Sequence, residues 1–385
     1  MKSDVTILIC TYNREKYISY CVESALSQTV PADEIVIVDD GSEDSTQEIL
    51  KKFSNKIKVF KKQNGGKAKA LNFALPFVES KYLWIMDDDD LCLPNAIEAH
   101  LKILNSDDKI DYSYSWFYRG HENLTNLGRL DVYKEERPLK VPEEDLFIRL
   151  MASCFIGHPA IVARTDCYRK LGGFNEHLFR CQDYEMLLRL ALNHRGAYLD
   201  KPTFICRTHT GVRGPQHCRV DFSENEKVFN RFNQTFIAPY YDTLPLEKYS
   251  TAEIRALPAD IQGRALLIHR ATIMARHSLW KQFFDDLNRV CCENSAGKRP
   301  LDKLEKELVR EAINYSDWHQ FSQIDGLLSD GRLKSRSIRL STELLVLLWG
   351  AFARQIHRNF RLSRLPAFAR IFSFLGKIAF NSFSR

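Results

Sequence analysis

The chain has 385 residues, of which 44% are hydrophobic and 27% charged, the composition of an ordinary globular protein with room for two domains. No stretch reaches the roughly 18 consecutive apolar residues that a membrane-spanning helix needs. The net charge of +6 is uneven, because the residues from Arg332 onward carry +10 and the first 331 carry −4. The ten cysteines include no CxxC pair, so neither a typical zinc site nor a CxxC redox motif is expected. We expect reduced thiols in a cytoplasmic protein.

The first hundred residues alternate between short apolar runs and helical patterns. We expect helices that end near residue 28 and that span residues 43–53, 68–78 and 95–104. Strands are expected at residues 5–10, 34–38, 57–60 and 82–86. Strands that alternate with helices of this length predict an α/β fold with a mostly parallel, doubly wound sheet.

Polar and acidic residues follow three of these strands: residues 11–13, residues 39–42 and the run Asp87 to Asp90. Ligands of open α/β sheets bind beyond the carboxyl ends of the strands. Four adjacent carboxylates repel one another unless a cation joins them, and Asp87 and Asp89 could hold Mg²⁺ or Mn²⁺. The structural alternatives are an acidic, solvated loop that caps the next helix, and a plain turn at residues 39–42.

The common nucleotide-binding fingerprints are missing from the sequence. There is no GxGxxG after the first strand and no GxxxxGK[ST] segment, so a Rossmann dehydrogenase or a P-loop enzyme is not expected.

Several blocks occur instead in a fixed order, and their spacing is more specific than any one of them. The first five lie at residues 9–14, 27–29, 37–42, 64–72 and 87–90 with Pro94, and three more at residues 172–176, 181–185 and 207–209. Together they resemble the family 2 glycosyltransferases, which have a GT-A fold, over roughly residues 3–220. Two positions depart from the pattern: Cys10 stands where proline is usual, and Gln182 replaces a glutamate.

The resemblance implies roles for individual residues. Thr11 and Asp40 would hold the nucleotide base and ribose, Lys67 would approach the diphosphate, and Asp87 with Asp89 would form the DXD motif that binds the metal, Mn²⁺ or Mg²⁺. The full set implied for the nucleotide-sugar is Thr11, Tyr12, Asp40, Lys67, Asp87, Asp88, Arg207 and His209. Asp183 aligns with the catalytic base.

Asp183 also has a structural interpretation. Asp183, Glu185 and Arg189 have a spacing typical of ion pairs on a helix face whose other side is apolar. Glycosyl transfer, however, needs a general base to activate the acceptor hydroxyl and positive charge to stabilise the departing diphosphate. Because the upstream blocks are present, we favour the role of general base for Asp183.

The C-terminal third is predicted to be helical, with helices at residues 223–234, 259–277, 280–292 and 301–314 and a linker at residues 294–300. In residues 368–383 the polar positions Arg370, Ser373, Lys377 and Asn381 recur at helical spacing, and apolar side chains cover the rest. Basic amphipathic helices with aromatic residues suit an anionic membrane surface. Packing on the protein's own core or on a second subunit is the alternative.

We therefore predict three parts: a catalytic domain at residues 1–220, a helical domain at 221–331 and a basic amphipathic tail at 332–385. The predicted activity is inverting transfer from a nucleotide-diphosphate sugar, a UDP-sugar by preference, to a saccharide or lipid-linked saccharide hydroxyl in glycan, lipopolysaccharide or capsule synthesis. The alternatives are a polyprenyl-phosphate sugar synthase and a non-catalytic nucleotide-sugar-binding protein. Residues 1–4 lead straight into a strand without a signal peptide, so a cytoplasmic protein is expected, peripheral on the membrane if the tail docks. Nucleic acid is not an expected partner.

Overall fold

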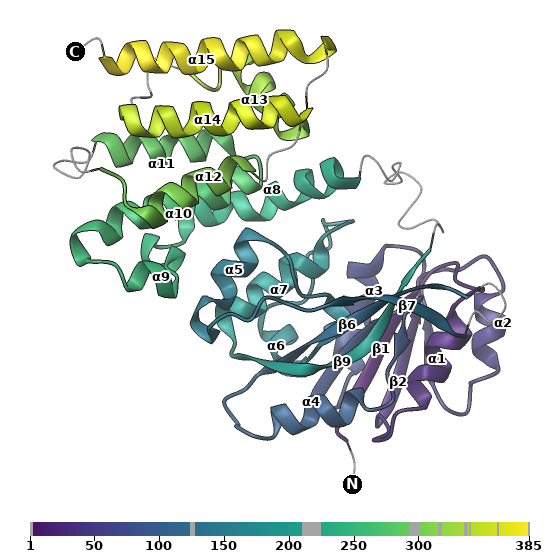
Figure 1. Cartoon of the computed structure of the whole chain (residues 1–385). Helices are drawn as coiled ribbons and strands as arrows, with labels where there is room; N and C mark the ends of the chain where they lie inside the picture. The colour runs from purple at the N-terminus through teal and green to yellow at the C-terminus, as the bar shows by residue number, and fades with distance from the viewer. Residues whose placement is uncertain are drawn as a thin grey trace. The chain divides into compact units, whose positions relative to one another are not determined.

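The computed structural model of the chain describes residues 3–123, 128–209, 225–292, 300–314, 318–334, 338, 340–359 and 362–383. The chain divides into two compact units, residues 1–221 and 222–385 (Figure 1). The predicted linker at residues 294–300 lies outside the described residues except for Pro300.

Among its described residues, unit 1 contains a nine-stranded mixed sheet with the order β3-β2-β1-β4-β8-β6-β9-β5, and β7 pairs with the outer part of β6. The strands are β1 (Val5–Thr11), β2 (Glu34–Asp39), β3 (Lys58–Lys61), β4 (Tyr82–Asp87), β5 (Leu91–Cys92), β6 (Tyr112–Glu122), β7 (Leu130–Glu136), β8 (Ile161–Arg164) and β9 (Gly196–Thr208). The predicted α/β fold is confirmed.

The parallel half of the sheet follows directly from the apolar runs. Every residue of β1 is buried, as expected for a strand with helices over both faces. The register sets Thr11 of β1 opposite Asp39 of β2, and Cys10 opposite Asp87 of β4. The three polar strand ends of the sequence therefore meet at one edge of the sheet, which we call the carboxyl edge.

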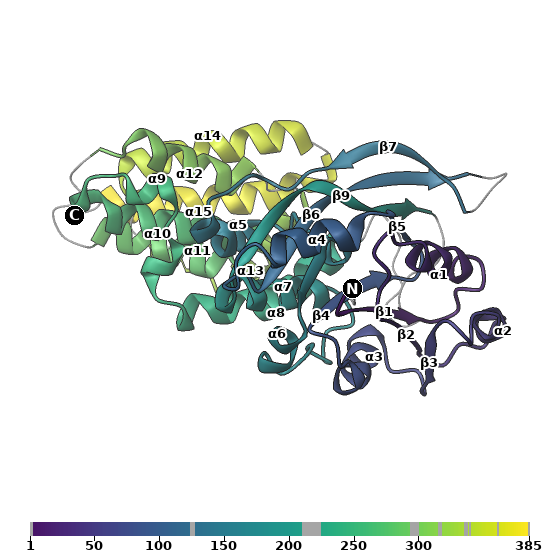
Figure 2. The same ribbon diagram turned by 90° about the horizontal axis from the view of Figure 1, so that it is seen from below.

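Helices cover both faces of this sheet (Figure 2). They are α1 (Ile18–Leu26), α2 (Thr46–Lys51), α3 (Lys67–Ala74), α4 (Ala96–Leu104), α5 (Leu146–Ala152), α6 (Thr165–Lys170) and α7 (Gln182–Asn193), with short 3₁₀ turns η1 (Leu75–Phe77), η2 (Glu143–Asp145) and η3 (His158–Ala160). The second half of the sheet is mixed: β8 runs antiparallel to β4 and β6, while β9 runs parallel to β6. The aromatic side chains at alternate positions of β6, those of Tyr112, Tyr114 and Trp116, are all buried.

Unit 2 is helical in its described residues. Its helices are α8 (Asn225–Thr243), α9 (Ala252–Arg255), α10 (Ala259–Arg276), α11 (Trp280–Cys292), α12 (Lys303–Asn314), α13 (Trp318–Ser329), α14 (Thr342–Asn359) and α15 (Leu365–Phe383), with the 3₁₀ turns η6 (Leu246–Tyr249) and η9 (Leu362–Arg364). None of the helices within the described ranges is long and apolar enough to cross a bilayer.

The predicted basic tail, residues 332–385, is built into the core of unit 2. On α15, Phe368, Ile371, Phe374, Leu375 and Ile378 are buried, and four of these five share one apolar cluster with residues of α10, α11 and α12. The alternative of packing on the protein's own core is therefore correct for this side of α15. Arg336, Arg339, Arg361 and Arg385 of the tail lie outside the described residues.

Candidate functional site

The acidic run at the end of β4 pairs with cations drawn from several other segments. Asp87 forms an ion pair with the ammonium group of Lys67, the first residue of α3. Both side chains are partly exposed, 35% for Asp87 and 29% for Lys67. Burial lowers the pKa of Lys67, but the carboxylates of Asp87 and Asp183 outweigh it and leave that pKa raised. The lysine therefore stays protonated and contacts Asp87, one of the predicted site residues.

Asp88 is an acid of the run whose pKa is raised. Burial, followed by the charge of Asp89, raises the pKa of Asp88 to about 7, against the opposing effects of Arg14 and Thr11. Arg14 Nε lies 3.3 Å from Asp88 Oδ1, and Thr11 is buried at the end of β1. Tyr12 follows, half-buried. Excess negative charge at this point favours an incoming cation.

Asp89 meets the end of β9. His209 Nε2 lies 2.9 Å from Asp89 Oδ2, and the imidazole is almost wholly buried against the ring of Tyr17. Arg207, also buried, donates from Nε to the Asp89 carbonyl at 2.7 Å and from its backbone N–H to Asp90 Oδ1 at 2.9 Å. A carboxylate oxygen and an imidazole nitrogen are both ligand types that suit a divalent ion such as Mn²⁺.

Asp40 holds the loop that precedes α3. Its carboxylate accepts hydrogen bonds from the backbone N–H groups of Gly65 and Gly66, the latter at 2.7 Å, and an ion pair from Lys62 Nζ at 2.6 Å. Gly41 has φ +85°, and a Cβ there would lie 2.8 Å from the backbone nitrogen of Asn64. Glycine is therefore required at position 41, where the loop after β2 approaches the loop after β3. The second of these loops leads into Lys67.

Asp39 behaves as the turn alternative expects. Its Oδ1 accepts the Ser42 N–H at 2.8 Å and its Oδ2 accepts Gln47 Nε2 at 2.7 Å. Ser42 Oγ in turn accepts the N–H of Asn13 at 2.9 Å, where the chain leaves β1 with φ +52°. These bonds fix the loops after β1 and β2 to each other.

Asp183 lies in the first turn of α7, after Cys181, which has φ +60°. Its Oδ1 accepts the N–H of Tyr184 at 2.9 Å. The helix ion pair that the sequence allowed exists for Glu185 and Arg189, at 2.7 Å, and Asp183 has no part in it. The Asp183 charge instead contributes to raising the pKa of Lys67 and opposes the lowering of the pKa of His158.

The loop between α6 and α7 is fixed over α3. Asn72 Oδ1 accepts the Phe174 N–H at 2.7 Å, and Asn72 Nδ2 donates to the Phe174 carbonyl at 2.9 Å. Gly173 has φ +76°, and a Cβ there would lie 2.5 Å from Asn72 Oδ1. Arg189 donates to the carbonyl of Gly173. Residues 172–176 and α3, about a hundred residues apart, thus form one wall beside Lys67.

Sequence reasoning gave no role to three residues that the structure places in this group. Arg14 pairs with Asp88, and Lys62 pairs with Asp40. His158 is buried, and burial, with a smaller effect of Lys67, lowers its pKa to about 4. Arg14 lies inside the first sequence block and Lys62 lies two residues before the fourth, whereas His158 is near none of them.

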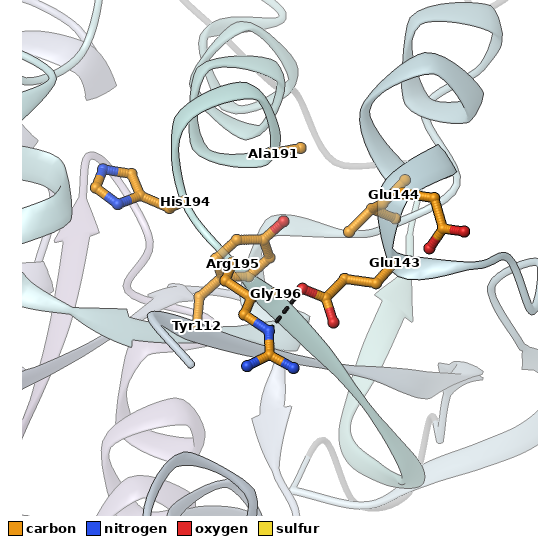
Figure 3. A pocket seen from close by; sticks show the side chains of 8 residues that line it. Tyr112, Glu143, Glu144, Ala191, His194, Arg195 and Gly196 are labelled. Atoms are coloured by element: carbon orange, nitrogen blue, oxygen red, sulfur yellow. Dashed lines mark hydrogen bonds and ion pairs between the residues drawn. The ribbon is translucent and has the colours of Figure 1, made fainter. Parts of the chain in front are cut away.

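A cavity of about 400 Å³ lies at the opposite edge of the sheet, where β6 and β9 begin (Figure 3). Glu143, His194 and Arg195 line it, and Arg195 Nε bonds Glu143 at 2.6 Å. Beside it, side-chain ligand atoms of Asp111, Cys167 and His194 lie within 4.8 Å of one another. None of the predicted site residues is among these two groups, so this edge is separate from the acidic run.

Comparison with known protein families gives a match within unit 1. The family model described as glycosyl transferase family 2 matches residues 6–168. An uncharacterized glycosyltransferase of Rickettsia felis is 32% identical over 196 residues, which is 49% of this chain and 32% of that protein. One of Rickettsia typhi is 31% identical over 52% of this chain and 62% of its own length. The chondroitin synthase of Pasteurella multocida is 31% identical over 51% of this chain and 20% of its own length.

The chain thus spans about a third of the Rickettsia felis relative and under two thirds of the Rickettsia typhi one. Among solved structures, S. aureus TarS aligns over 93% of this chain and 54% of its own, with 20% identity and a TM-score of 0.49. The mannosyltransferase PcManGT of Pyrobaculum calidifontis aligns over 99% and 88%, with 15% identity and a TM-score of 0.41. Both TM-scores are below 0.5, which is too low to infer a shared ligand.

Proposed function

Because residues 6–168 are a glycosyltransferase family 2 domain with a GT-A fold, we propose that this chain transfers a sugar, with inversion, from a nucleotide-diphosphate donor to a saccharide hydroxyl. The observation that carries the proposal is the convergence of the polar ends of β1, β2 and β4 at the carboxyl edge, where Lys67 pairs with Asp87. It supports a site in which a diphosphate can meet a cation beside a carboxylate that could hold a metal.

Lys67 is the group we assign to the diphosphate. Its ion pair with Asp87 is partly exposed, and such pairs contribute only about 0–1 kcal/mol. A diphosphate carries more negative charge than one carboxylate, so we expect the ammonium group to move from Asp87 to the donor at little cost. The exchange would leave the Asp87 carboxylate available to a cation.

Asp89 and His209, with Asp87, are the residues we assign to a divalent metal, Mn²⁺ or Mg²⁺. A bound ion would supply Lewis-acid stabilisation of the charge on the departing diphosphate. Arg207 holds the site together, since it bonds the carbonyl of Asp89 and the carboxylate of Asp90.

Asp183 is the proposed general base. Its carboxylate would take the proton of the acceptor hydroxyl as that oxygen bonds to the anomeric carbon. The bond from this carbon to the diphosphate oxygen breaks at the same time, and the diphosphate leaves with the electron pair. Attack opposite the leaving group inverts the anomeric centre, by the same geometry as in inverting hydrolases.

Thr11, Tyr12, Asp40 and Asp88 complete the proposed donor site for base, ribose and phosphates. We propose a UDP-sugar as donor and a saccharide, free or lipid-linked, as acceptor in the synthesis of a glycan, lipopolysaccharide or capsule. A contact of the Asp40 carboxylate with the nucleotide base would add to the hydrogen bonds that it already accepts from the N–H groups of Gly65 and Gly66.

The test is nucleotide release over a panel of UDP- and GDP-sugars with saccharide acceptors, with Mn²⁺, with Mg²⁺ and with EDTA. We expect release of UDP that requires acceptor and metal, and a product with inverted anomeric configuration by NMR. Binding of UDP in calorimetry without turnover on any pair would instead favour the non-catalytic alternative. Turnover on polyprenyl phosphates alone would favour the polyprenyl-phosphate synthase.

A further inference from the structure

Helix α15 has two apolar faces, and only one of them is used by the core of unit 2. The buried face is formed by Phe368, Ile371, Phe374, Leu375 and Ile378. A second apolar row follows the helix at spacings of three and four residues: Leu365, Ala369, Phe372, Gly376, Phe380 and Phe383. Phe380 is 73% exposed, Phe383 63% and Leu365 45%. A solvated helix of a globular protein usually has polar side chains on that side.

Helix α14 extends this second face. The two helices lie side by side (Figure 1) and run antiparallel, because Trp349 stacks on Phe372 with ring centroids 4.6 Å apart and the Leu340 N–H bonds Ser382 Oγ at 3.0 Å. Val346, one turn before Trp349, is 64% exposed. We call the outer row of α15, with Val346, Trp349, Gly350 and Ala353, the outer face of α14–α15.

The charges carried by α14 and α15 are mostly positive. Residues 342–383 contain six basic residues and one acid, Glu343. Glu343 is already engaged, since it pairs with Lys306 at 2.8 Å and accepts the Leu301 N–H. Arg354 and Lys377 are exposed and form no ion pair with any residue that the structure describes. An exposed apolar face flanked by unpaired cations is typical of helices that lie in the interface of a bilayer.

From this arrangement we infer that the outer face of α14–α15 docks unit 2 on an anionic lipid bilayer. A helix of 19 residues lying flat presents its outer apolar row over about 28 Å, which suits insertion to the depth of the lipid headgroups. The cations flank that row and reach the negative lipid surface. A second copy of the chain is a poorer occupant, because a symmetric contact would bring two sets of like charges together.

This inference does not depend on the proposed function, since lipid binding is measured without donor or acceptor. The full chain is sedimented with phosphatidylcholine vesicles that contain or lack phosphatidylglycerol, at low and at high salt. We expect binding only to the anionic vesicles, weakened by salt.

Two pairs of substitutions separate the charges from the aromatic side chains. Arg354→Glu with Lys377→Glu should weaken vesicle binding by about 30-fold or more, since each basic residue near the surface contributes about fivefold. Phe380→Ser with Phe383→Ser should weaken it by about 10- to 100-fold. Lys248→Glu reverses an exposed charge on η6 and should leave binding unchanged. Arg354, Lys377, Phe380 and Phe383 are all exposed, so thermal unfolding of both double variants should match the wild type.

Absence of wild-type binding to anionic vesicles would overturn the inference, as would binding that neither pair of substitutions weakens. Sedimentation-velocity measurements address the second-copy alternative. A wild-type dimer that the two phenylalanine substitutions turn into a monomer, with no lipid binding in either form, would assign the face to self-association.

Discussion

The two units contain ion pairs of opposite character. At the carboxyl edge of unit 1, Lys67 and Asp87 are about one third exposed and meet through one pair of atoms. In unit 2, Arg264 binds both oxygens of Glu305 at 2.7 Å, with side chains 4% and 0% exposed. Arg270 holds Asp286 in the same two-pronged way, at 2.8 and 2.6 Å.

The difference in geometry separates exchangeable charges from fixed ones. A partly exposed, single contact is worth little and can be replaced by a ligand at little cost. A buried, two-pronged pair has no such freedom, because the loss of one partner leaves an uncompensated charge in the interior. We therefore expect substitutions at the carboxyl edge to change turnover and binding, and substitutions at the buried pairs of unit 2 to change stability.

The largest effect should follow from Asp183→Asn. General-base catalysis contributes about 10²- to 10⁴-fold, so kcat should fall by that factor, about 3 to 5 kcal/mol of barrier. The asparagine oxygen can still accept the Tyr184 N–H, so the free energy of unfolding should change by less than about 0.5 kcal/mol. Steady-state kinetics and urea unfolding measure the two quantities.

Glu185→Gln is the matched control for Asp183→Asn, two residues along the same helix. Glu185 pairs with Arg189, which keeps its bonds to the carbonyls of Leu171 and Gly173, so kcat should change only a few-fold. If Asp183→Asn turned over at nearly the wild-type rate, Asp183 would be a structural residue and the proposed base would have to be sought elsewhere.

Arg264→Met should act on stability alone. It leaves the buried Glu305 carboxylate with only the backbone N–H of Asp302 and should lower the free energy of unfolding of unit 2 by about 3 to 5 kcal/mol. The affinity for UDP, measured by calorimetry on folded protein, should be unchanged.

Lys281→Met provides the contrast for Arg264→Met. Lys281 and Asp285 form an exposed i,i+4 pair at 2.6 Å, worth about 0.3 to 0.5 kcal/mol. Equal losses of stability in the two variants would remove the distinction between fixed and exchangeable pairs.

Local sequence patterns were sufficient to predict the parallel half of the fold. β1, β2 and β4 are continuous apolar runs because both faces of each strand are buried, and their polar ends mark the edge where they meet. The pairing of β6 with β9 joins segments about 85 residues apart, and a periodicity within each strand contains nothing about such a partner. The mixed half of the sheet was therefore not predicted.

The candidate site shows the same limit. The carboxylates could be selected from their order along the chain, yet the contacts of Asp40 with Lys62 and of Asp88 with Arg14 depend on how loops pack. The C-terminal tail shows the same limit of local sequence patterns. Helical spacing reveals that α15 is apolar on two sides, but it does not reveal which side the core covers. Burial settled that point in favour of the face containing Phe368 and Leu375.

Lys67→Met tests whether the exposed pair of unit 1 is exchangeable. A hydrogen bond between a charged donor and phosphate contributes about 1.5 to 3 kcal/mol, so the Kd for UDP should rise by about 10- to 150-fold. Stability should change by less than about 1 kcal/mol. Lys69→Met, an exposed lysine on the same helix, is the control. A large loss of stability without a change in UDP affinity would contradict the assignment of Lys67 to the donor.

A further prediction concerns a buried group of unit 1 that has no partner to exchange. His100 on α4 is fully buried, and neither ring nitrogen has a hydrogen-bond partner among the described residues. Burial lowers the pKa of His100 from 6.5 to about 3. The imidazole stays neutral in the folded state, while the unfolded chain takes up a proton below pH 6.5. Stability is therefore lost as the pH falls from about 6.5 towards 3.

At pH 5 this loss amounts to about 2 kcal/mol relative to pH 8, and His100→Leu should remove it. The difference between urea unfolding at the two pH values should shrink by that amount, although the buried His158, whose pKa is about 4, keeps a share of the dependence. His177→Leu removes an exposed imidazole and is the control. If the free energy of unfolding of His100→Leu depended on pH as the wild type's does, the prediction would be contradicted. Only a site closed to water can keep this imidazole neutral, so that result would mean that α4 opens to water before the unit unfolds.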